Sequence, residues 1–317
     1  MERNLALEVV RVTEAAALFA SRYVGRGDAE KAFVSAVEAM AKVFSSVSID
    51  GRIVISKYSA DGTLISTNSP LGNKNGPEVD VVIDALDGRK TIARGGNNSV
   101  SAVAMGERGA FFIPPTQYME KIAVGSDVKG IVDITEPPEI NIKRVARAKN
   151  KYIEDVTVCV LDRPRHSKII EKIRNVGARI ILIPDGDISG AIAAAMDDRP
   201  IDILMGTGGA MEGVLAAAAI KCLGGDIQAR LIFSSEKEKE LAVESGVKDP
   251  DKIFMLSDLI PGKDLMFSAT GITDGEFLKG VRFISGGAKT DSIVMRLKTH
   301  TVRYITAMHR FDYKPMY

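Results

Sequence analysis

Two aspartates in the first half of the chain have the type and spacing of metal ligands. They are Asp84 and Asp87, in the stretch DVVIDALDGRKT at residues 80–91. At positions i and i+3, where a strand runs into a turn, both carboxylates can face one cation, and the carbonyl of Leu86 offers a third oxygen. Hard oxygen ligands of this kind suit Mg²⁺ or Mn²⁺. The alternative is an aspartate-rich turn whose side chains bond their own backbone.

Polar and flexible residues also follow three apolar strands of the second half. The arginines of DRPRH suit a phosphate or carboxylate, because a guanidinium donates in a bidentate geometry. The aspartates of PDGD suit sugar hydroxyls, and the glycines of GTGGAME let backbone N–H groups meet an anion at the start of a helix. A simple tight turn and a solvated loop are the alternatives. The residues are Arg163, Arg165 and His166, then Asp185 and Asp187, then Gly206 to Glu212.

The elements that position these residues change character along the chain. Apolar periodicity predicts helices over residues 5–19 and 29–45, the second with Asp28 as N-cap, and then strands over 52–58, 79–86, 99–106 and 109–115. Beyond about residue 155, apolar strands at 155–162, 178–187 and 201–210 alternate with helices, as in a parallel sheet. Ligands of such sheets gather beyond the carboxyl ends of the strands, so the polar strand ends should converge on one cleft. The residues from 264 to 305 return to strands.

Bulk composition excludes several classes of protein. The 317 residues are 45% hydrophobic and 26% charged, with a formal charge of +1, which is no general reason to expect a nucleic acid or membrane partner. Two cysteines in apolar runs, Cys159 and Cys222, and a charged amphipathic N-terminus favour a cytoplasmic protein. A dehydrogenase is excluded because no glycine-rich fingerprint follows the first strand of the sheet.

The order of motifs resembles the class II fructose-1,6-bisphosphatases, the GlpX-type family, over essentially the whole chain. The motifs are ALEVVRVTEAAAL, GRGD, SIDG, DALDG, YMEKIAVG, RPRH, IPDGD, GTGGAMEGVL and FSATGIT. The resemblance implies an α/β fold, the layered α/β sandwich of the metal-dependent, lithium-sensitive sugar and inositol phosphatases. It also implies Mg²⁺- or Mn²⁺-dependent removal of the 1-phosphate of fructose 1,6-bisphosphate in gluconeogenesis, by a homo-oligomer that is a dimer or tetramer.

Carried over residue by residue, the resemblance divides the site between metal and substrate. It makes Asp84, Asp87 and Glu212 metal ligands, with Asp87 where the family usually has Glu. The substrate contacts implied are Asp87, Gly88, Arg89, Tyr118, Arg163, Pro164, Arg165, Asp185, Gly186, Asp187 and Gly209. We expect domains at residues 1–155, with the metal site, and 156–317, with the sugar-phosphate contacts, and an active-site cleft between them.

Three positions depart from the family's pattern. Phe33 and Lys57 stand where the family has acidic ligands, and Arg89 stands where it has a water-activating Thr, two residues before Thr91. Phenylalanine offers no ligand atom and a protonated lysine offers no lone pair. We therefore expect Asp84, Asp87, Lys57 and Arg89 to form the catalytic group, with the two basic side chains as resident cations beside the carboxylates.

Two hypotheses about activity stay open. The first is a phosphatase that uses one metal at Asp84, Asp87, the Leu86 carbonyl and Glu212, with Asp61 in support. The second is a catalytically impaired relative without a metal, which binds a sugar phosphate or an active subunit in a regulatory role. Phe33 as simple core packing and Lys57 or Arg89 turned to solvent are the alternatives for the three substitutions.

Overall fold

The computed structural model describes residues 4–56 and 65–313, which form two compact units. The first unit contains the described residues up to Phe111 and those from Gly262 onward, and the second unit is Phe112–Pro261. Each unit is built on a sheet of its own. Within the described ranges, none of the helices has both the length and the apolar character that crossing a bilayer requires.

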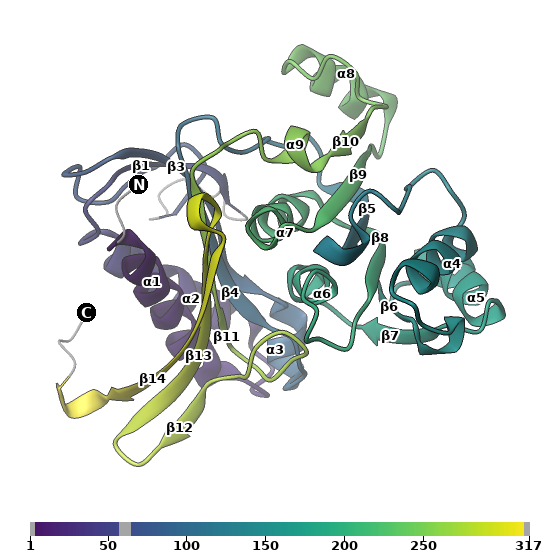
Figure 1. Cartoon of the computed structure of the whole chain (residues 1–317). Helices are drawn as coiled ribbons and strands as arrows, with labels where there is room; N and C mark the ends of the chain where they lie inside the picture. Colours follow the sequence, from purple (N-terminus) through teal and green to yellow (C-terminus); the bar gives the residue numbers. More distant parts are fainter. Residues whose placement is uncertain (1–3, 57–64, 314–317) are drawn as a thin grey trace. The chain divides into compact units, whose positions relative to one another are not determined.

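The first unit opens with two long helices. They are α1 (Leu5–Ala20), followed by the short 3-10 helix η1 (Ser21–Tyr23), and α2 (Ala29–Phe44). The side chain of Asp28 accepts a hydrogen bond from the backbone N–H of Lys31, which confirms the predicted N-cap. Figure 1 shows the two helices side by side along the sheet of this unit, and their buried residues share one core with its strands.

The sheet of the first unit contains eight strands among the described residues, in the order β12-β13-β11-β4-β3-β1-β2 with β14 paired to β13. Among these described strands, only the pairing of β1 with β3 is parallel. The strands are β1 (Asp50–Ser56), β2 (Pro70–Leu71), β3 (Glu78–Asp87), β4 (Val100–Gly106), β11 (Leu265–Gly271), β12 (Arg282–Ile284), β13 (Gly287–Arg296) and β14 (Thr301–Arg310). The short helices of this unit are α3 (Arg89–Arg94), η5 (Leu297–Thr299) and η6 (Phe311–Tyr313).

The second unit is a six-stranded sheet, in the order β10-β9-β5-β8-β6-β7, covered by helices on both faces. Its strands are β5 (Tyr118–Val124), β6 (Thr157–Leu161), β7 (Arg179–Ile183), β8 (Ile203–Gly209), β9 (Asp226–Ile232) and β10 (Ile253–Met255). Its helices are η2 (Ser126–Val128), α4 (Pro138–Ala148), η3 (Ile153–Asp155), η4 (Pro164–His166), α5 (Ser167–Asn175), α6 (Asp187–Ala194), α7 (Ala210–Leu223), α8 (Glu236–Glu244) and α9 (Leu256–Leu259). In Figure 1, α4 and α5 lie on one face of this sheet, and α6 and α7 on the other.

Alternation along the strands explains the two covered faces. Val158 and Val160 of β6 belong to the core under α4 and α5, whereas Cys159 between them lies next to α6 at Gly190. Both cysteines are buried thiols, in β6 and in α7 as expected, and burial raises the pKa of the Cys222 thiol to about 12.

Three expectations about the fold need correction. The units do not divide near residue 155, because β5 pairs with β8 and β9 while β11 and β13 return to the first sheet. No strand forms over residues 109–115, where Pro114 and Pro115 lack the N–H groups that a ladder needs. The second sheet is mixed, because β6 pairs parallel with β7 and β8, whereas β5 pairs antiparallel with β8 and β9.

Candidate functional site

Asp84 and Asp87 lie together at the end of β3, and a bulge brings them there. Asp84 pairs with Ala102 and Asp87 with Val100, so three steps along β3 match two steps along β4. Residues three apart in a regular strand point to opposite faces, and one extra residue cancels that offset. Carboxylate oxygens of the two aspartates accordingly lie within 4.8 Å of one another. The backbone N–H of Leu86 also donates to Oδ1 of Asp84 at 3.3 Å.

The two aspartates suit a hard divalent cation. Asp84 and Asp87 are each 1% exposed. Two buried carboxylates at this separation favour a positive charge beside them, and oxygen donors are the ligands that Mg²⁺ and Mn²⁺ take. The donor set of this bulge therefore fits the metal that the sequence predicts.

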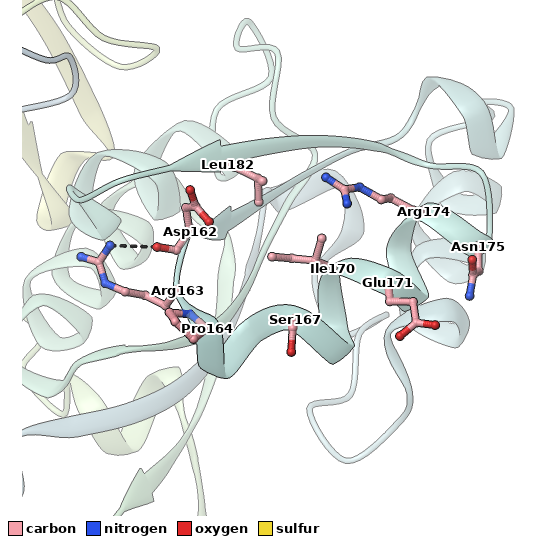
Figure 2. Close-up of a pocket in the computed structure, with 9 residues that line it drawn as sticks. All are labelled: Asp162, Arg163, Pro164, Ser167, Ile170, Glu171, Arg174, Asn175 and Leu182. Atoms are coloured by element: carbon pink, nitrogen blue, oxygen red, sulfur yellow. Dashed lines mark hydrogen bonds between the residues drawn. The ribbon is translucent and has the colours of Figure 1, made fainter.

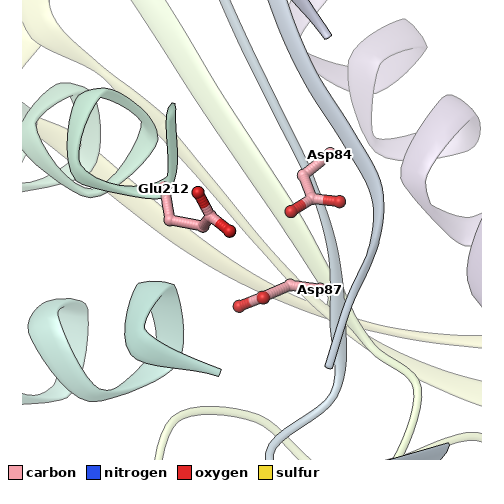
Figure 3. Close-up of side chains that lie close together, drawn as sticks. All are labelled: Asp84, Asp87 and Glu212. Carbon is pink, nitrogen blue, oxygen red and sulfur yellow. The ribbon is translucent and has the colours of Figure 1, made fainter. Parts of the chain in front are cut away.

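The third expected ligand is Glu212, and Figure 3 draws its side chain as well as those of Asp84 and Asp87. The aspartates extend from β3 of the first unit, and Glu212 extends from the first turn of α7 in the second unit. Glu212 is half-buried, and a Cβ at Gly209 would collide with its carboxylate. The absence of a side chain at Gly209 is thus what allows Glu212 to fold back over the start of α7.

Arg89 does not turn away into solvent. It begins α3 directly after Gly88, whose φ of 84° is in the left-handed region that favours glycine. Its guanidinium carbon lies 3.1 Å from the centre of the Phe33 ring, and Phe33 is 1% exposed in α2. Two of the three positions that we expect to depart from the family's pattern are therefore in contact with each other. The third, Lys57, and the supporting Asp61 lie outside the described residues.

The polar residues of the second unit gather at the carboxyl ends of β6, β7 and β8, as expected for neighbouring parallel strands. Arg165, in η4, donates from Nε and Nη2 to the carbonyl of Thr207 at 3.1 and 2.7 Å. Its guanidinium also lies 5.6 Å from the ring centre of Tyr118, at the start of β5. The backbone carbonyl of Thr207 thus fixes the direction of Arg165.

Arg163 and Asp185 lie on the neighbouring strand ends. Arg163 donates to the carbonyls of Asp162 and Pro184 at 3.0 and 2.5 Å. Its Nη2 is 3.9 Å from Oδ1 of Asp185, close enough for a weak, partly exposed ion pair. Gly186 follows as the left-handed N-cap of α6. Arg163 is therefore tied to both strand ends on which the predicted contacts lie.

His166 links the ends of β6 and β8 as a neutral side chain. Its Nε2 accepts a hydrogen bond from the backbone N–H of Thr207 at 2.9 Å, so Nδ1 carries the proton and donates to the carbonyl of Leu161 at 2.7 Å. Burial lowers the pKa of His166, and the positive charges of Arg165 and Arg163 act in the same direction. His166 therefore shapes the site rather than carrying charge in it.

Lys121 is the residue of this site that the sequence analysis missed. It is 2% exposed, it lies in β5, and its Nζ donates to Oδ2 of Asp187 at 2.5 Å and to the carbonyl of Gly209 at 2.9 Å. A sequence signal was present, because a single lysine interrupts the inward-facing apolar positions Met119 and Ala123.

A separate pocket of about 500 Å³ lies beside α5 and β7 in the second unit. Figure 2 shows its lining residues and the hydrogen bond from Arg163 to the carbonyl of Asp162. Arg163 and Pro164 are the only predicted substrate contacts among the residues that line it. This pocket therefore does not coincide with the place where the other predicted contacts converge.

Comparisons with known proteins agree with the resemblance. The family model described as bacterial fructose-1,6-bisphosphatase, glpX-encoded, matches residues 3–309. The chain is 41% identical over 326 residues to fructose-1,6-bisphosphatase class 2 of Haemophilus influenzae, covering 98% of each chain. It is 38% and 37% identical to two Synechococcus proteins named D-fructose 1,6-bisphosphatase class 2/sedoheptulose 1,7-bisphosphatase, covering 98% of this chain and 97% of each of those.

These matches extend over both units, and they include every residue of the bulge and of the strand ends described above. The likeness is thus neither a shared fragment nor a shared fold alone. The chain belongs to the class II, GlpX-type fructose-1,6-bisphosphatase family, a family of metal-dependent phosphatases.

Proposed function

We propose that the chain hydrolyses fructose 1,6-bisphosphate to fructose 6-phosphate and phosphate, as a metal-dependent phosphomonoesterase of gluconeogenesis. The observation that carries this proposal is the gathering of two arginines and two aspartates at the strand ends of the second unit, in a chain that matches this family over its length. Guanidinium groups suit the phosphates of such a substrate, and carboxylates suit its hydroxyls.

In this proposal the second unit holds the sugar bisphosphate. Arg165 uses two of its N–H groups on Thr207, and the rest of its five donors stay available for a phosphate. Holding the guanidinium before the substrate arrives lowers the entropy lost on binding. Tyr118, Arg163, Pro164, Asp185, Gly186, Asp187 and Gly209 complete the proposed contacts of this unit.

We propose that Asp84, Asp87 and Glu212 hold the divalent cation, Mg²⁺ or Mn²⁺. A bound cation of this kind neutralises phosphate oxygens and makes a water molecule more acidic. Arg89, which Phe33 and Gly88 hold in place, adds a permanent positive charge that can bind a phosphate oxygen. Arginine cannot accept a proton at neutral pH, so Arg89 can supply positive charge but cannot do the work of a water-activating hydroxyl.

The test is phosphate release from fructose 1,6-bisphosphate by purified protein with Mn²⁺ or Mg²⁺. Sedoheptulose 1,7-bisphosphate is the second substrate, since two relatives carry it in their names. We expect hydrolysis that Asp84→Ala abolishes and that Arg165→Met weakens mainly through KM. Hydrolysis that survives Asp84→Ala would contradict the role proposed for Asp84.

A second candidate function is binding without turnover. The contact of Arg89 with Phe33 favours it, because a guanidinium and an aromatic ring stand where the family's pattern has a hydroxyl and an acidic ligand. Such a relative would bind fructose 1,6-bisphosphate or an active subunit in a regulatory role. Calorimetric binding of the substrate without phosphate release, with either metal present, would select this candidate.

We further propose a cytoplasmic homo-oligomer, a dimer or tetramer. Light scattering on the purified protein, with and without metal, tests the oligomeric state directly.

A further inference from the structure

Lys121 is a buried lysine with two fixed partners in the second unit. The side chains of Lys121 and Asp187 are 2% and 7% exposed, and Nζ lies 2.5 Å from Oδ2 of Asp187. The same ammonium donates to the carbonyl of Gly209 at 2.9 Å. The carbonyl anchors the ammonium, and the ammonium in turn holds the carboxylate.

Two glycines make room for this lysine. A Cβ at Gly208 would lie 2.9 Å from Nζ of Lys121 and would collide with Oδ2 of Asp187. A Cβ at Gly213, in α7, would lie 3.0 Å from Cδ of Lys121. Backbone from both β8 and α7 therefore closes around the side chain, which leaves it one position.

A sugar phosphate does not reach the ammonium. The cavity that Lys121 and Asp187 line with His166 has a volume of about 10 Å³, room for a single water molecule at most. Lys121 can therefore affect a ligand only through a residue that the ligand touches. Both of its partners, Asp187 and Gly209, are proposed substrate contacts, and Asp187, at the first residue of α6 beyond β7, is the one that offers a side chain to the sugar.

A gain in stability does not by itself explain why Lys121 and Asp187 form a buried ion pair. Two apolar residues of similar volume are often no less stabilising than a buried pair of charges, because burial removes the hydration of both ions. What the pair supplies is direction, since the bond to Oδ2 of Asp187 fixes the orientation of the carboxylate.

We propose that Lys121 is a positioning residue that orients Asp187 for a hydroxyl of the sugar. The proposal rests on the proposed function insofar as the ligand is a sugar phosphate. Removing Lys121 frees the carboxylate to rotate, so the ligand would lose one charge-assisted hydrogen bond.

The test compares Lys121→Met with a matched control, Lys151→Met. Lys151 donates to Oδ1 of the buried Asp202 at 2.7 Å, but this pair precedes β8 at the opposite end of the sheet. Calorimetry with fructose 1,6-bisphosphate and with fructose 6-phosphate measures binding, and steady-state kinetics separate KM from kcat. Urea unfolding measures the stability of each variant.

We expect Lys121→Met to weaken binding of both sugar phosphates by about tenfold to a hundredfold, the loss of one charge-assisted hydrogen bond, with KM changed more than kcat. Lys151→Met should leave binding unchanged. The double variant Lys121→Met with Asp187→Asn removes both charges, so it keeps the proposal testable if the single variant fails to fold. It should bind no more weakly than Asp187→Asn alone.

Each outcome separates this proposal from the proposed function. Unchanged binding by Lys121→Met, or a double variant weaker than Asp187→Asn, overturns the role of Lys121 alone. Binding without hydrolysis by the unmodified protein overturns the phosphatase activity alone. Absence of any binding by the unmodified protein overturns both.

Discussion

Replacing Gly209 by alanine should move the side chain of Glu212 while it leaves the stability of the chain almost unchanged. Gly209 has φ −65° and ψ 140°, a conformation that alanine adopts without strain. The added Cβ would collide with Oε2 of Glu212 and would lie 2.6 Å from Oε1. The backbone can therefore stay in place while the Glu212 side chain has to turn away.

The size of the effect follows from what the side chain loses. A shift off its preferred rotamer costs about 0.5–1.5 kcal/mol, roughly a factor of 2 to 13 in a binding constant, and removal of one group that stabilises the transition state electrostatically typically costs about 10²–10³ in rate. We expect Gly209→Ala to reduce both Mn²⁺ affinity and activity by about tenfold, which lies between these limits. Alanine should also stabilise the chain by about 0.4–1 kcal/mol through the unfolded state. This gain offsets most of the rotamer cost of Glu212, so the free energy of unfolding should change little.

The assay is calorimetric titration of Mn²⁺ into metal-stripped protein, beside urea unfolding and phosphate release. Glu212→Ala is the control: it should lower Mn²⁺ affinity by itself, and adding Gly209→Ala to it should cause no further loss. Unchanged Mn²⁺ affinity in Gly209→Ala would refute the reasoning, and so would an additional loss in the double variant.

Three other perturbations test the local structure. Phe33→Leu should lower the free energy of unfolding by roughly 1–3 kcal/mol. A double-mutant cycle with Arg89→Met, measured by urea unfolding, should give a coupling energy of about 0.5–2 kcal/mol for the guanidinium–ring contact. Additive effects of the two substitutions would contradict that contact. Gly88→Ala should destabilise the folded chain by about 1–3 kcal/mol, because φ is 84° and the added Cβ would lie 2.7 Å from Oγ of Ser99. Adding Ser99→Ala to this variant should relieve the clash but not the backbone strain, as measured by urea midpoints. Folding lowers the pKa of His166 from 6.5, so on acidification the unfolded chain takes up this proton before the folded chain does. The stability that neutral His166 contributes is therefore complete above pH 6.5 and falls below it, by at most about 1.4 kcal/mol per pH unit. Urea unfolding at several pH values should show this slope, and His166→Gln should flatten it.

The helices of the first unit follow from local patterns. Periodic apolar residues predict a helix from residue 5, and the structure has α1 at Leu5–Ala20. Asp28 predicts the start of α2, and its side chain does accept the bond from Lys31. A helix closes its hydrogen bonds within itself, so a short stretch of sequence carries most of the information about it.

The division into units does not follow from local patterns. β5 comes before the expected boundary near residue 155, yet it pairs with β8 and β9 beyond it. β11 and β13 come late in the chain and complete the first sheet beside β4. Pairing between strands distant in sequence depends on which edges meet, and no window of residues contains that information.

The same distinction between local pattern and tertiary contact applies to the site. The sequence by itself determined that arginine, aspartate and glycine follow the predicted strands, and that position 33 carries no ligand atom. Only the tertiary structure decided that a bulge turns Asp84 and Asp87 to one face, that Arg89 packs on Phe33, and that Lys121 meets Asp187. The physical reason is that each of these contacts joins separate elements, or depends on the register between two strands, and a side chain's surroundings are settled only when those elements pack together.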